Sequence, residues 1–255
     1  MIVEPRGAVG RLVHLLKLIG SGPPTFTLTE LAIRASLPTS TVHRLLQELV
    51  RSNLVERSSS RAYRPGRELY LLASRMVAKF DIVGCARPFL EELGEQWKET
   101  VVLCIYSPSA LNAVVSDLVL TPHPLRYGIE TGDVIELPWG SLGRAILAHL
   151  PSEHRIAILD VRKIGPISGR RMPSLADMEA ILAGIRAQGH ARHCDPENDL
   201  AGIASPIFGR GNEVLGCLGV TMPARRFGLH SEEQLSQALR SAAVALSERA
   251  RISQS

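Results

Sequence analysis

The first 50 residues contain three stretches in which apolar residues recur at helical spacing. The stretches run from Val9 to Ile19, from Leu28 to Ala35 and from Val42 to Leu49, and each would bury one apolar face. Residues 20–24, Gly-Ser-Gly-Pro-Pro, end the first stretch, because glycine and proline interrupt a helix. Pro38 separates the other two and is suited to the first turn of a helix. The pattern predicts three short helices joined by tight turns.

Polar residues around these helices support the same organisation. Residues 27–30, Thr-Leu-Thr-Glu, predict a capping box, in which a threonine hydroxyl and a glutamate carboxylate each accept a backbone N–H. Behind the third helix, residues 54–57 and 61–64 flank three serines and predict a two-stranded hairpin. A hairpin that follows three such helices indicates a winged helix-turn-helix domain in residues 1–66.

Charge is distributed unevenly along the chain. Residues 1–79 hold 12 Lys and Arg against 5 Asp and Glu, whereas residues 80–255 hold 17 against 20. A basic head on a mildly acidic body indicates that the head binds a polyanion, although a basic surface that only aids solubility stays open. The head has few aromatic residues, which argues against stacking of single-stranded bases and favours double-stranded DNA.

The third helix and the hairpin carry side chains suited to DNA. Hydroxyl, imidazole, guanidinium and amide groups contact phosphates and the edges of bases in the major groove. On the helix these groups belong to Thr39, Ser40, Thr41, His43, Arg44 and Gln47. The hairpin adds Arg57, Arg61 and Arg64, predicted to contact the phosphate backbone as a wing. The alternative is an ordinary amphipathic helix with a solvated polar face.

The rest of the chain predicts a linking helix over residues 67–79 and an α+β domain over residues 80–255. The expected helices of this domain are 86–98 and 231–249. The expected strands are 100–106, 111–119, 202–208 and 214–221, the last two joined by a turn at 209–212. Residues 189–195 are expected to form a polar loop.

Specific stretches in both parts resemble one family. Residues 37–46, Leu-Pro-Thr-Ser-Thr-Val-His-Arg-Leu-Leu, within a match over residues 8–70, resemble the DNA-binding domain of the IclR (isocitrate lyase regulator) family of bacterial transcription factors. Residues 137–148 and 202–208 resemble its effector-binding domain, which has a GAF-like fold. The resemblance implies a ligand-responsive transcriptional regulator, either a repressor or an activator, of a catabolic operon.

The resemblance also implies where an effector binds. In the family, the loop before a Gly-Arg/Lys-Ala sequence and the last two strands line the ligand cavity. Here these positions are Trp139, Gly140, Ser141 and Leu142 in the loop, and Gly202, Cys217, Gly219 and Thr221 in the last two strands. Arg126, Arg192 and His193 are candidate cationic groups, and both arginines have a solvated surface position as the alternative. Together they favour a small organic acid, including aromatic acids.

Enzyme and metal chemistry find little support in the sequence. His190, His193, Cys194 and Asp195 lie close together but lack a second half at zinc-site spacing. Gly140-Ser141-Leu142-Gly143 lacks the first glycine of a nucleophile elbow, and Gly209-Arg210-Gly211 lacks the lysine of a phosphate-binding loop. We therefore expect no catalysis, no metal and no cofactor. The alternative function is that of an architectural DNA-binding protein without an effector.

Further expectations concern location and assembly. No apolar run approaches the length that spans a bilayer, and the first residues do not resemble a secretion signal. The four cysteines have no paired spacing, which is typical of reduced thiols. These features predict a cytoplasmic protein without membrane contact. Because one winged domain offers little specific area, we expect a homodimer or homotetramer on a pseudo-palindromic operator.

Overall fold

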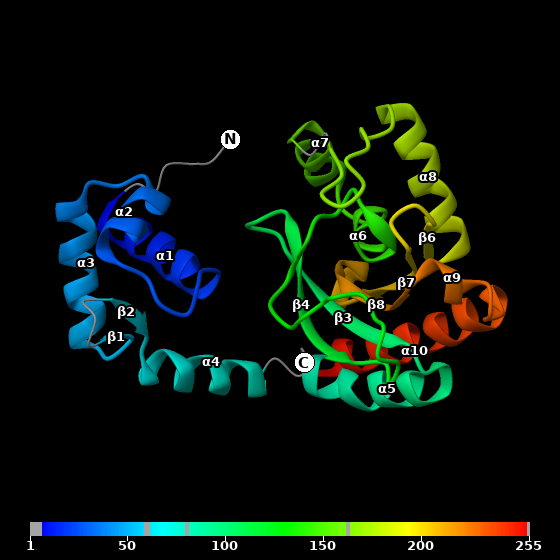
Figure 1. The fold of residues 1–255 in the computed structure, drawn as a ribbon, viewed down its shortest axis with the longest axis horizontal. Coiled ribbons are helices and arrows are strands. Elements are labelled where there is room, and N and C mark those ends of the chain that lie inside the picture. The colour runs from blue at the N-terminus through cyan, green and yellow to red at the C-terminus, as the bar shows by residue number, and fades with distance from the viewer. Residues whose placement is uncertain (1–6, 59–61, 80–81, 162–163, 254–255) are drawn as a thin grey trace. The chain divides into compact units, whose positions relative to one another are not determined.

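The computed structural model describes residues 7–58, 62–79, 82–161 and 164–253. It divides the chain into two compact units, Met1–Phe80 and Asp81–Ser255. Figure 1 labels the helices and strands of both units.

Unit 1 is a winged helix-turn-helix, as predicted. Its elements are α1 (Gly7–Gly20), α2 (Leu28–Ala35), α3 (Thr39–Arg51), β1 (Val55–Arg57), β2 (Tyr63–Pro65) and α4 (Arg67–Lys79). Leu15 of α1, Leu31 of α2 and Leu46 of α3 are completely buried in a common core. The predicted apolar faces of the three helices therefore pack against one another.

Local contacts explain where α2 begins and ends. The Thr27 hydroxyl accepts a hydrogen bond from the Glu30 N–H at 3.2 Å, and the Glu30 carboxylate accepts one from the Thr27 N–H at 2.7 Å. The backbone N–H and then the hydroxyl of Thr27 lower the pKa of Glu30. Ser36 ends the helix in a left-handed conformation at φ 52°. The predicted capping box is present.

The second wing strand differs from the prediction. It was expected over residues 61–64 but runs from Tyr63 to Pro65, where Val55 is the register partner of Pro65. A proline is tolerated here because this two-stranded sheet has only edge strands, so its missing N–H can face away from the partner.

Unit 2 contains a six-stranded antiparallel sheet in the order β5-β4-β3-β8-β7-β6. The strands are β3 (Thr100–Ser107), β4 (Asn112–Val119), β5 (Val134–Ile135), β6 (Ala191–Asp195), β7 (Leu200–Phe208) and β8 (Val214–Met222). The first three strands and the last three each form a meander, and β3 pairs with β8 to join them. The predicted turn between β7 and β8 is a short 3-10 helix, Arg210–Asn212.

Helices cover both faces of this sheet (Figure 1). Their bounds are α5 (Ile82–Trp97), α6 (Gly140–Leu147), α7 (Ser152–Val161), α8 (Leu175–Gln188), α9 (Ala224–Phe227) and α10 (Glu232–Ser253). Alternate residues of a strand point to opposite faces. Accordingly, Val101 and Leu103 pack with α5 and α10, whereas Val102 and Cys104 pack with α6 and α8. The predicted α+β class is confirmed.

Two expected elements of unit 2 need correction. The helix expected at 86–98 begins four residues earlier, at Ile82, and contains Pro88. The polar loop expected at 189–195 is largely the edge strand β6, whose residues 191–195 pair with residues 200–204 of β7. An edge strand has one pairing side only, so it tolerates the polar composition that suggested a loop.

Candidate functional site

The first candidate site is the outward face of α3. The helix buries Val42, Leu45, Leu46 and Leu49. Thr39, Ser40, His43 and Arg44 are exposed, and Thr41 and Gln47 are half-buried, so all six predicted residues lie on one accessible side or at its edge. Pro38 precedes the helix without a side-chain cap, which leaves the positive end of the helix dipole accessible to an anion such as a phosphate.

The wing arginines have partners within unit 1. The Arg57 guanidinium lies 5.8 Å from the centre of the Tyr63 ring. Arg64 forms an ion pair with Glu56 at 2.9 Å, and Glu56 also accepts the backbone N–H of Arg67. This N–H and then Arg64 lower the pKa of Glu56. The Arg64 pair is exposed and therefore weak, so it does not prevent contact with a phosphate. Arg61 lies outside the described residues.

The second candidate site is a cavity of about 360 Å³ in unit 2. Seven short segments supply its wall: residues 127–129, 133–136, 139–142, 165–168, His193 with Asp195, 200–202 and Thr221. The structure brings together at this cavity seven of the expected residues: Trp139, Gly140, Ser141, Leu142, His193, Gly202 and Thr221. The wall also contains apolar residues that the sequence did not single out, among them Tyr127, Ile129 and Ile167.

The predicted loop at residues 139–142 is in fact the start of α6. Gly140 is the first residue of the helix and has φ 66°, a conformation that favours glycine. Residues 140–142 line the cavity, so the first turn of α6 lies at its wall. Trp139 provides no side-chain cap for the N–H groups of this turn. The Ser141 hydroxyl lies over Gly202, where an added Cβ would be 2.9 Å from its oxygen. Gly202 therefore makes the space that Ser141 occupies.

His193 faces the same part of the cavity. Gly202 is the register partner of both His193 and Thr221, so these three residues form a row across β6, β7 and β8. Burial and then the positive charge of Arg144 lower the pKa of His193. Arg144 itself donates to the Pro138 carbonyl at 3.0 Å. Both effects favour the neutral imidazole of His193.

Asp195 is a buried carboxylate on the cavity wall, and its two oxygens have different surroundings. Its Oδ2 accepts a hydrogen bond from Asn198 at 2.8 Å. Its Oδ1 has no hydrogen-bond partner within the described part of the chain, although Arg170 lies 3.8 Å away. The Asn198 hydrogen bond, more than the charge of Arg170, lowers the pKa of Asp195. The sequence pattern had indicated Asp195 only as a metal ligand candidate.

Four predicted residues are not on the cavity wall. Arg126 is exposed to solvent. Arg192 precedes His193 on β6, so it points to the other face, where it pairs with Glu232 at 2.8 Å. Cys217 and Gly219 lie beneath Leu142: the Cys217 thiol donates to the Leu142 carbonyl at 3.4 Å, and a Cβ on Gly219 would be 2.5 Å from the Leu142 side chain.

Neither metal ligands nor a membrane span are seen in the described ranges. No group of three His, Cys, Asp or Glu side chains within them could hold a metal ion. None of the helices described has both the length and the apolar composition needed to cross a bilayer.

Comparisons with known proteins cover nearly the whole chain. The family model for the "IclR helix-turn-helix domain" matches residues 8–59, and that for "Bacterial transcriptional regulator IclR C-terminal" matches residues 74–248. The transcriptional repressor IclR of Escherichia coli is 26% identical over 220 residues, which cover 85% of this chain and 80% of the relative.

Two solved structures show the same arrangement of elements. A putative IclR transcriptional regulator from Silicibacter is 26% identical with a TM-score of 0.85, covering 95% of this chain and 96% of that one. An IclR homologue from Microbacterium hydrocarbonoxydans, solved with 4-hydroxybenzoate, has 23% identity and a TM-score of 0.76, covering 95% and 98% of the two chains. The chain belongs to the IclR family of DNA-binding transcriptional regulators, and the family is not enzymatic.

Proposed function

We propose that this regulator senses a small organic acid, including aromatic acids, in the cavity of unit 2 and controls a catabolic operon in the cytoplasm. The observation that supports this most is the convergence of the α6 N-terminus, Ser141 and His193 on one cavity. Helix N-termini favour anions through their free N–H groups and the helix dipole. Asp133, a carboxylate also on the wall, is exposed and accepts the Glu130 N–H.

The remaining wall favours a ligand with an apolar body and a second polar group. The wall is apolar at Ile129, Trp139 and Leu142, as the walls of small-molecule sites generally are. Asp195 also lines the cavity, and its Oδ1 has no hydrogen-bond partner in the described part of the chain, so a ligand hydroxyl or amine that reaches it would satisfy it. An aromatic acid with a hydroxyl group has both features. The complex of the Microbacterium homologue with 4-hydroxybenzoate supports this class of effector.

Thermal-shift measurements with benzoate, 4-hydroxybenzoate and pyruvate test the proposal. An acid at 100 times its Kd should raise the melting temperature by about 5–10 °C. Ile167→Trp, which fills the cavity from its wall, should abolish this shift. Ile156→Trp on α7 is the matched control, because Ile156 is 68% exposed and does not line the cavity. Equal stabilisation of both variants would place the site elsewhere, and no stabilisation by any acid would favour the architectural alternative.

Binding of an acid should depend on the protonation of His193. A carboxylate beside the imidazole would stabilise its charged form and raise the pKa that burial and Arg144 lower. The complex then holds more protons than the free protein, so affinity should rise as the pH falls from 8 to 6. The gain is up to about tenfold for each unit by which the pKa rises. Calorimetric titration of His193→Gln should show a flat profile; an unchanged slope would exclude His193.

For the DNA, we propose that α3 enters the major groove while the wing follows the backbone. Two α3 helices of a dimer would read a pseudo-palindrome, with half-sites about one helical turn apart. Selection of bound duplexes from a random pool by the full chain should return such a sequence. An effector that prefers one arrangement of the two heads would change DNA affinity, for which a coupling of about 1–3 kcal/mol suffices.

A further inference from the structure

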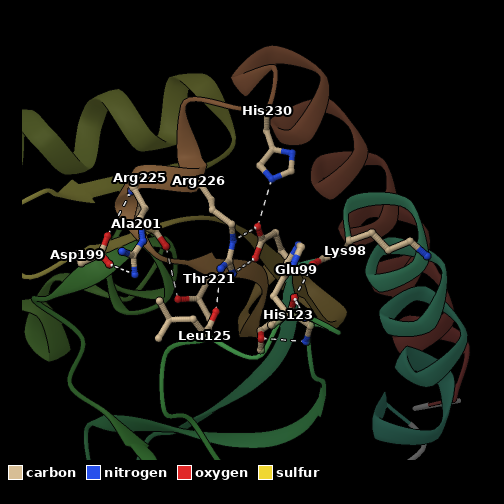
Figure 2. Close-up of polar contacts among 12 residues, drawn as sticks. Lys98, Glu99, His123, Leu125, Asp199, Ala201, Thr221, Arg225, Arg226 and His230 are labelled. Atoms are coloured by element: carbon tan, nitrogen blue, oxygen red, sulfur yellow. Dashed lines mark hydrogen bonds and ion pairs between the residues drawn. The ribbon is translucent and has the colours of Figure 1, made fainter.

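Two neighbouring arginines of the short helix α9, Arg225 and Arg226, contact different parts of unit 2 (Figure 2). It follows β8 and directly precedes α10. Arg225 reaches Asp199, and Arg226 reaches Glu99 and the backbone of Leu125. The arrangement is relevant to the cavity because Asp199 and Leu125 each lie close in sequence to a segment of its wall.

Arg226 contacts the segment that leads to wall residues 127–129. Its Nε and Nη2 donate to the two oxygens of Glu99 at 2.7 and 2.6 Å, and its Nη1 donates to the Leu125 carbonyl at 2.8 Å. Glu99 is 1% exposed, so its carboxylate and the two hydrogen bonds that it accepts from Arg226 are shielded from solvent. The chain continues from Leu125 to Tyr127, Gly128 and Ile129, which line the cavity. One planar guanidinium thus ties Glu99, which directly precedes β3, to the chain two residues before the cavity wall.

Arg225 contacts Asp199, which directly precedes wall residues 200–202. Its Nη2 lies 2.9 Å from Oδ2 of Asp199, and its backbone N–H donates to Oδ1 at 3.3 Å. Asp199 has φ 49°, an uncommon conformation for this residue, and Leu200 of the cavity wall follows immediately. The Arg192 guanidinium lies 5.1 Å from the centre of the Phe227 ring, and this contact attaches β6 to α9. Three parts of the wall therefore meet at one four-residue helix.

We propose that Arg225 and Arg226 are positioning residues of the cavity. By holding Asp199 and Leu125, they fix the adjacent wall residues 200–202 and 127–129 to α9 and, through it, to α10. The inference rests on the proposed function only for what the cavity binds. A wall held in place before binding lowers the cost of ordering it around a ligand. Lysine cannot replace Arg226 in this role, because an ammonium does not span a carboxylate and a carbonyl with fixed geometry.

Hydrogen exchange of the full chain tests the proposal without any effector. Arg226→Lys keeps a positive charge beside Glu99 but should raise exchange of the amides in residues 125–129 about tenfold, through loss of the bond to Leu125. Arg87→Gln is the matched control: Arg87 also joins two carboxylates, Glu91 and Asp117, and one carbonyl, Leu118, but none of these residues lines the cavity. It should leave exchange in residues 125–129 unchanged.

Arg225→Gln should raise exchange at residues 199–202 by a smaller factor, because its ion pair is exposed. This variant carries the test if Arg226→Lys does not fold. Unchanged exchange at these segments in folded variants, or an equal rise in Arg87→Gln, would overturn the proposal.

Titration with benzoate adds a binding readout. Arg226→Lys should bind it about tenfold more weakly than the wild type, and Arg87→Gln with unchanged affinity. If exchange rises as expected but benzoate does not bind the wild type, the organic-acid proposal fails for this probe while the positioning role stands. Equal benzoate affinity in Arg226→Lys and the wild type would contradict the positioning role.

Discussion

Replacing Arg44 by alanine is expected to weaken binding of the full chain to its selected duplex by about 1–3 kcal/mol, or roughly 5- to 150-fold in Kd. Arg44 is exposed on α3, next to the buried Leu45 and Leu46, so its side chain points away from the core of unit 1. A guanidinium at this position can reach the edge of a base or a phosphate. Fluorescence anisotropy at fixed salt measures the loss.

The way in which DNA affinity is lost distinguishes a base contact of Arg44 from a phosphate contact. Loss of a base contact should be selective for one base pair, whereas loss of a phosphate contact should weaken binding to every duplex and reduce the salt slope by about 1. Arg51→Ala is the control on the same helix, because Arg51 lies in the last turn and pairs with Glu48 at 2.7 Å. An equal effect of both substitutions would show that unspecific charge, and not the start of α3, governs binding.

Gly143→Ala should destabilise unit 2 by about 1–3 kcal/mol, near the upper end, because overpacking here meets backbone and not a flexible side chain. A Cβ on Gly143 would lie 2.6 Å from the Glu136 carbonyl oxygen and 2.8 Å from the Leu137 Cα. Residues 136 and 137 would have to move away from α6, and Trp139 of the cavity wall would move with them. The melting temperature should fall by roughly 3–10 °C, and binding of any effector should weaken.

Gly184→Ala is the matched control for this prediction. Gly184 also lies inside a helix, α8, but an added Cβ there would meet nothing within 4 Å. Alanine is the better helix former by about 1 kcal/mol, so this variant should melt at the same or a higher temperature. Circular dichroism of both variants decides the outcome. Equal melting temperatures would mean that α6 and residues 136–137 adjust to the extra methyl group without strain.

The sequence was most informative where structure depends on neighbours along the chain. The spacing of Val42, Leu45, Leu46 and Leu49 predicted the buried face of α3, because residues three and four positions apart share one side of a helix. The Thr27–Glu30 capping box and the turn at 209–212 were likewise predicted, since each depends on contacts over a few residues. The family resemblance identified Trp139 to Leu142 as a candidate wall, which they form in the structure.

Only the tertiary structure decided which polar residues face the cavity. Arg192 and His193 are adjacent and equally plausible in the sequence, yet the pairing of β6 with β7 directs only His193 to the cavity. The hydrogen-bonded pair of Arg226 and Glu99 joins residues 127 positions apart, and no local sequence pattern predicts such a pair. Its partners meet because β3 and β8 lie side by side in the sheet. Strand order and register, set by long-range pairing, therefore determine the chemistry of the cavity.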